Sequence, residues 1–136
     1  MARMLGAWMH INNPHRTAQE DLNLTVGGVI SLSAADVGKL VPGQLFKVRV
    51  KVMDDDTFSD DLVFTDESFS VGVNDSAPRP FHTGVIVPRA KLRAAEPSYE
   101  HGVEVYCKVS AFLKNNQGRV VIDTGSGTTH TETVNI

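Results

Sequence analysis

The stretch FKVRVKVM, residues 46–53, decides the fold class of this chain of 136 residues. Apolar side chains occupy every second position in it, and basic side chains lie between them. A period of two residues sends the two kinds of side chain to opposite faces of a β-strand. We therefore predict a strand here with one buried face and one face in water.

Other segments with strand-like alternation lie on both sides of this one, and turn-forming residues separate them. The predicted strands are residues 22–32, 62–64, 68–73, 82–88, 103–113, 119–124 and 129–136. Gly27 and Gly28 interrupt the first of these, which predicts a bulge or a turn at that point. The sequence NNQG at residues 115–118 predicts a tight turn, so the strands beside it should form a hairpin.

Few segments of this sequence are predicted to form a helix. Ser33 can cap one helical turn before Pro42 and Gly43 form a β-turn, and residues 90–102 could form a helical turn or a loop. About seven to nine short strands without helical crossovers predict an all-β protein, an antiparallel β-sandwich. We expect a single domain over residues 22–136, with residues 1–21 as an N-terminal arm or an edge strand.

Composition narrows the class of protein further. The single cysteine, Cys107, lies on the apolar phase of a predicted strand, so we expect a buried, unreactive thiol. No apolar run is long enough to span a membrane, and the first residues lack a Sec-type signal pattern. We expect a cytoplasmic protein, or one exported by a route without a signal. Because basic residues are not concentrated in the sequence, we expect no nucleic-acid partner.

The acidic residues, in contrast, are concentrated in one segment. Seven of the 16 acidic residues fall between positions 54 and 67, where the chain has no Lys or Arg. Carboxylates spaced two residues apart on an extended backbone can converge on a calcium ion, which takes about six to eight oxygen ligands. We predict a calcium site whose ligands are Asp54, Asp56, Asp60 and Asp61.

The segment VKVMDDDTFSDDLVF, residues 50–64, resembles the third calcium-binding loop of C2 domains, where an apolar strand ends in Asp-x-Asp and another Asp follows. The resemblance implies that Asp54 and Asp56 are paired ligands and that Asp60 or Asp61 returns to the same ion. The resemblance favours a membrane as the ligand. We expect a C2-like or jelly-roll-like sandwich whose ion holds an anionic or hydroxyl-rich ligand, such as a phospholipid head group or a glycan, or rigidifies an interface with a protein partner. Phe58 would be the apolar residue at the tip. Asp75 would join the site if its loop lies at the same end.

Two other interpretations stay open. The acidic segment could be a solvated loop that keeps a strand edge from pairing with neighbouring molecules. The protein could instead be a structural subunit of a homo-oligomeric assembly, whose N-terminal arm and β-branched C-terminal tail pair with neighbours. Trp8 could contact a partner or a sugar, or it could fold back onto the core.

One motif raises an enzymatic alternative. VVIDTGSG, residues 120–127, resembles the catalytic motif of pepsin-like and retroviral aspartic proteases, with Asp123 as the catalytic acid. Gly127 departs from that motif, and most of a protease subunit would have to follow Asp123, where few residues remain. We therefore expect a strand ending in a glycine turn, in a protein that is not an enzyme.

Overall fold

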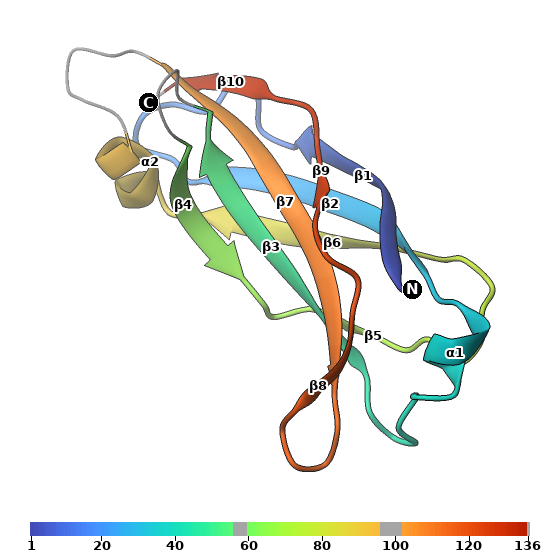
Figure 1. Cartoon of the computed structure of the whole chain (residues 1–136). Coiled ribbons are helices and arrows are strands. Elements are labelled where there is room, and N and C mark those ends of the chain that lie inside the picture. The colour runs from blue at the N-terminus through green and yellow to red at the C-terminus, as the bar shows by residue number, and fades with distance from the viewer. Residues whose placement is uncertain (56–59, 96–101, 136) are drawn as a thin grey trace.

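The computed structural model describes residues 1–55, 60–95 and 102–135, and it confirms the all-β fold. Two antiparallel sheets pack face to face as a β-sandwich (Figure 1). The smaller sheet has three strands in the order β1-β2-β6. These strands are β1 (Arg3–Ile11), β2 (Leu22–Ser31) and β6 (Arg79–Val87).

The larger sheet is built on two long central strands, β3 (Phe46–Asp54) and β7 (Gly102–Lys114), which pair with each other. Two short strands pair with the free edge of β3, namely β4 (Asp61–Asp66) and β5 (Ser70–Val71). Three short strands follow one another along the free edge of β7 (Figure 1). They are β8 (Val120–Asp123), β9 (Gly127–Thr128) and β10 (Glu132–Asn135).

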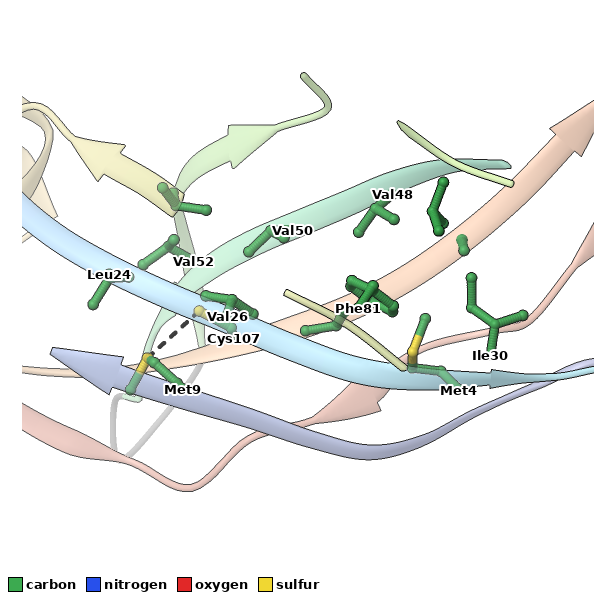
Figure 2. Packing of buried hydrophobic residues seen from close by; sticks show 14 of the residues in the cluster. Met4, Met9, Leu24, Val26, Ile30, Val48, Val50, Val52, Phe81 and Cys107 are labelled. Carbon is green, nitrogen blue, oxygen red and sulfur yellow. Dashed lines mark hydrogen bonds between the residues drawn. The ribbon is translucent and has the colours of Figure 1, made fainter. Parts of the chain in front are cut away.

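The core lies between the two sheets and contains the apolar phase of each long strand. In β3, Val48 and Val50 are 1% exposed, whereas Lys47 and Lys51 on either side of them are exposed, as the alternation predicts. Cys107 of β7 is fully buried, and its Sγ lies 3.6 Å from Met9 Sδ of the other sheet (Figure 2). The prediction of a buried free thiol is therefore confirmed.

The prediction of a bulge or turn at Gly27 and Gly28 is wrong. β2 runs through both glycines and pairs with β6 without a break. Each glycine leaves room for a side chain of β1, since a Cβ on Gly27 would lie 2.5 Å from the Trp8 indole and one on Gly28 2.7 Å from Met4 Sδ. The irregularity is in β1 instead, between Leu5 and Trp8.

Short helices and turns connect the strands much as the sequence indicates. Ser33 caps α1 (Ala34–Val37), and its hydroxyl and the Asp36 carboxylate form a reciprocal capping box. The second helix, α2 (Arg89–Ala95), occupies part of the segment predicted as a helical turn or a loop. The turn between β7 and β8 closes with Gly118 at a φ of 78°, a conformation that favours glycine.

The segment that resembles an aspartic-protease motif is the end of an edge strand. β8 ends at Asp123, and the Asp123 carboxylate accepts a hydrogen bond from the Gly125 N–H at 2.8 Å. Gly125 has a φ of 68°, so the glycine supplies the backbone freedom that this turn requires. The predicted strand ending in a glycine turn is therefore present.

Candidate functional site

Four described aspartates, Asp54, Asp55, Asp60 and Asp61, lie at one end of the sandwich, where β3 ends and β4 begins. Asp54 is the last residue of β3 and lies opposite Asp61, the first residue of β4. The Asp54 side chain is buried, with 1% of the residue exposed, whereas Asp55, Asp60 and Asp61 are exposed. The fold thus gathers three of the four predicted calcium ligands, together with Asp55.

Two other candidate residues, Asp75 and Trp8, lie elsewhere in the fold. Asp56 and Phe58 lie outside the described residues. Asp75 follows β5, which pairs with the opposite end of β3, so its loop lies far from the acidic end. Trp8 projects from the outer face of the smaller sheet, where it covers Gly27 and remains 41% exposed. Among the predicted site residues that the structure describes, those at the β3–β4 connection are therefore the candidates for one shared site.

Tyr106 of β7 links the acidic end to the outer face of the larger sheet. Its hydroxyl donates a hydrogen bond to Asp60 Oδ2. That bond, burial of the phenol and the negative charges of Asp60 and Asp55 raise the pKa of Tyr106 to about 12. All three causes favour the neutral phenol, so Tyr106 acts as a hydrogen-bond donor over the whole ordinary pH range.

A shallow hollow of about 290 Å³ lies beside this hydrogen bond. Its lining combines two carboxylates, one phenol, one ammonium group and three threonines: Asp55, Asp60, Tyr106, Lys108, Thr128, Thr129 and Thr131. The backbone N–H of Asp55 donates to Glu104 O at 2.7 Å, and its carboxylate accepts from Thr131 Oγ1 at 3.3 Å. The hollow therefore presents oxygen atoms, which calcium prefers as ligands, at fixed positions.

The described residues do not by themselves make a complete metal site. Within residues 1–55, 60–95 and 102–135, no three side chains of His, Cys, Asp or Glu converge closely enough to hold an ion. Calcium takes about six to eight oxygen ligands, so further oxygens would have to come from the loop after Asp55, from water or from a ligand. Calcium binding stays a prediction.

The outer face of the larger sheet is basic, although its basic residues are scattered in the sequence. We call this surface the basic face, and it consists of Lys47, Arg49 and Lys51 of β3 and Lys108 and Lys114 of β7. Lys51 lies directly opposite Lys108 in the register of the two strands. Two like charges in that position destabilise a sheet, so the arrangement costs stability unless an anion lies nearby.

One cation of the basic face is held by its neighbours. Arg49 Nε lies 2.6 Å from Glu67 Oε1, and the Arg49 guanidinium lies 4.8 Å from the centre of the Phe112 ring. Lys114 Nζ lies 5.7 Å from the same ring. In the described part of the chain, the lysines of the basic face have no carboxylate within ion-pair distance. Lys47 and Lys51 are also exposed, so an anionic ligand can reach their charges.

Sequence reasoning missed the basic face because pairing, and not proximity along the chain, creates it. The alternation of Lys47, Arg49 and Lys51 was visible, but the register that adds Lys108 was not. Lys108 also lines the hollow beside Asp60, so the acidic end and the basic face meet there.

Comparisons with known proteins add no relative to these observations. No family model, curated protein or solved structure matches the chain. Neither described helix is long and apolar enough to cross a membrane. The function therefore has to be inferred from the geometry and chemistry of the site.

Proposed function

We propose that this protein is a non-enzymatic β-sandwich module that binds an anionic ligand with the help of a calcium ion. One observation carries the proposal: aspartates at the end of β3 and the start of β4 lie beside the basic face, and the two surfaces meet at the hollow. In this mechanism Asp54, Asp60 and Asp61 supply part of the ligands of the ion, together with the expected ligand Asp56. Its open coordination positions accept oxygen atoms of the bound molecule.

The basic face favours one class of ligand over another. The resemblance to C2 loops favours a phospholipid head group, and a glycan is the other ligand that we expect. The lysines opposite each other in β3 and β7 attract phosphate and carboxylate groups, whereas a neutral glycan would leave their repulsion uncompensated. We therefore favour the head groups of anionic phospholipids as the ligand.

Calcium binding should also stabilise the fold. Carboxylates about 4–7 Å apart repel one another by roughly 1 kcal/mol per pair in a watery setting, and a bound cation removes that repulsion. A ligand that binds only the folded state raises its free energy of unfolding. Calcium should therefore raise the melting temperature of protein stripped of metal with EDTA.

A calcium titration by isothermal calorimetry, with thermal melts alongside, tests the proposal. We expect saturable binding and a raised melting temperature, both lost in Asp60→Asn/Asp61→Asn, whose altered side chains are exposed. Asp75→Asn/Asp123→Asn removes the same charge from exposed positions elsewhere and should bind like the unchanged protein. No heat and no shift in the unchanged protein would make the acidic end a solvated loop and end the proposal.

Binding to vesicles tests the ligand class. With calcium present, we expect binding to vesicles that contain phosphatidylserine and not to phosphatidylcholine alone. Lys51→Gln/Lys108→Gln should weaken that binding by about tenfold or more, since each lysine near an anionic surface contributes about 1 kcal/mol. Lys39→Gln/Lys91→Gln, at two exposed positions outside the basic face, is the matched control. Equal losses in both variants would contradict a role for the basic face.

A second candidate is a subunit of a homo-oligomeric assembly, and exposed apolar side chains on the smaller sheet favour it. Leu5, Trp8 and Ile86 are 43%, 41% and 58% exposed on its outer face. The strands near both termini pair within the chain, so an assembly would use this face and not exchanged strands.

Light scattering tests the second candidate. Deleting residues 1–20 would remove β1 and uncover the core, so a substitution is the better change. We expect an oligomer that dissociates in Leu5→Lys/Ile86→Lys. A monomer both before and after the substitution would rule the candidate out.

A further inference from the structure

A larger pocket, of about 440 Å³, lies between residues of β1, the loop that follows it, and β10. It shares no lining residue with the hollow at the acidic end. Next to it, β9 lies close against β1, since a Cβ on Gly127 would be 3.1 Å from the Ala7 Cβ. Toward β10, side chains of the two sheets line an open space instead. Its volume falls in the range of small-molecule sites, about 300–1,000 Å³.

The lining of this pocket is apolar on the inside and polar at the rim. Met9, Leu22 and Val134 are 3%, 0% and 4% exposed and belong to the core of the sandwich. His10 and His130 are exposed and line the same pocket. An apolar floor with a few polar groups around it suits an amphipathic molecule.

Arg16 supplies a buried positive charge to the same pocket. The residue is 7% exposed, and its guanidinium donates hydrogen bonds to Glu20 O at 3.0 Å and to Asn135 O. Both acceptors are main-chain carbonyl groups, and they use only part of the N–H groups that a guanidinium offers. Among the described residues, no carboxylate lies within ion-pair distance of Arg16.

Burying a charge without a counter-charge is costly. Burial accordingly lowers the pKa of Arg16 from its ordinary value, although the charges of Glu20 and Asp21 act in the opposite direction. An anionic group on a ligand would add a directly paired counter-charge to the more distant charges of Glu20 and Asp21, and guanidinium groups bind carboxylates and related oxyanions in a fork geometry.

We propose that this pocket binds a small amphipathic anion, whose carboxylate or sulfonate group pairs with Arg16 and whose apolar part lies on Met9, Leu22 and Val134. This site is independent of calcium and of the basic face. Glu132 is the one acidic residue among those described that line the pocket, and it lies 2.9 Å from His130 Nε2. Its negative charge limits the affinity for an anion.

A purely structural role for Arg16 is the competing explanation. Its hydrogen bonds tie the loop between β1 and β2 to the end of β10, and that alone could account for its burial. If Arg16 only holds these segments together, the pocket should show no preference for an anionic over a neutral ligand. The test therefore compares two ligands that differ mainly in charge.

Two fluorescent dyes make that comparison: 1-anilinonaphthalene-8-sulfonate, which is anionic, and N-phenyl-1-naphthylamine, its neutral counterpart. Titrating each into calcium-free protein should give saturable one-to-one binding of the sulfonate, at least about tenfold tighter than the neutral dye, because a charged hydrogen bond contributes about 1.5–3 kcal/mol. Arg16→Lys keeps the charge but loses the fork, so it should reduce that preference.

Glu132→Gln keeps the inference testable even if Arg16→Lys fails to fold. Removing this negative charge from the pocket lining should tighten binding of the sulfonate about threefold, the effect in water of a like charge about 7 Å away, and leave the neutral dye unchanged. Asp75→Asn removes one charge at a distant exposed site and should change neither dye. The inference is wrong if neither dye saturates, if both bind equally, or if Glu132→Gln behaves like Asp75→Asn.

Discussion

The hydrogen bond between Tyr106 and Asp60 determines much of the chemistry of the acidic end. It connects a strand in the middle of the larger sheet to the residue just before β4. The phenol holds one oxygen of Asp60 in place, which reduces the freedom of that carboxylate before any ion arrives. The same contact raises the pKa of Tyr106 to about 12.

Tyr106 should therefore lose its proton only at high pH. Its pKa in the folded protein is raised from 10.0 to about 12, so the neutral phenol contributes stability that is fully present below about pH 10. That contribution is lost as the pH rises from 10 to 12. Phenolate absorbance in a Tyr99→Phe background measures the midpoint of Tyr106. Asp60→Asn should lower the midpoint toward 10, and Asp61→Asn should not; equal midpoints in all three proteins would contradict the contact.

Among the strands, the broken edge along β7 depends on two buried threonines. A threonine lies directly after β8 and another directly after β9, and each continues the hydrogen bonding to β7 where the strand is interrupted. Thr124 Oγ1 accepts from Ala111 N, and Thr129 Oγ1 accepts from Cys107 N, both at 2.9 Å. The backbone N–H groups of the two threonines donate to the carbonyl oxygens of Ala111 and Cys107, each at 3.0 Å. Each threonine thus satisfies a buried backbone donor that the interrupted strand would leave without a partner.

Replacing either threonine with valine should destabilise the sandwich. Valine has nearly the same shape but cannot accept a hydrogen bond, so a buried N–H group of β7 loses its partner. Urea unfolding of Thr124→Val and Thr129→Val should each show a loss of about 1–3 kcal/mol. Thr128→Val, at an exposed neighbouring position, is the control and should stay within about 0.5 kcal/mol. Equal stabilities in all three variants would mean that the hydroxyl groups are dispensable.

At the scale of the whole molecule, the two sheets share one core, and Cys107 lies in it against Met9 of the opposite sheet (Figure 2). The thiol is 0% exposed, and burial raises its pKa to about 12. Both the burial and the pKa keep the reactive thiolate from forming near neutral pH. Cys107 therefore reports on separation of the sheets.

The thiol should react only when the sandwich opens. With Ellman's reagent at pH 8, we expect the folded protein to react at least about a thousandfold more slowly than protein in denaturant, because stable domains open that rarely. The rate should rise with urea in parallel with unfolding measured by circular dichroism. Rapid stoichiometric reaction in native buffer would show that the sheets separate locally at this point.

Much of the fold follows from local sequence, because a period of two residues is enough to assign faces to strands such as β3 and β7. The capped turn at Ser33 and the hairpin turn ending at Gly118 were predictable for the same reason, since they depend on a few adjacent residues. The nine-residue strand β1 was harder to identify, because its bulge between Leu5 and Trp8 shifts the alternation partway along it.

The sequence by itself determined that the chain is a β-sandwich with an acidic segment after its clearest strand, because alternation and composition are properties of neighbouring residues. Only the tertiary structure decided which distant residues share a surface. Strand register places Lys51 opposite Lys108 and sends Asp75 to the far end from Asp61. Packing between the sheets brings Arg16 into contact with Asn135 of β10. Register and packing depend on contacts between segments far apart in the chain, and a local pattern does not specify them.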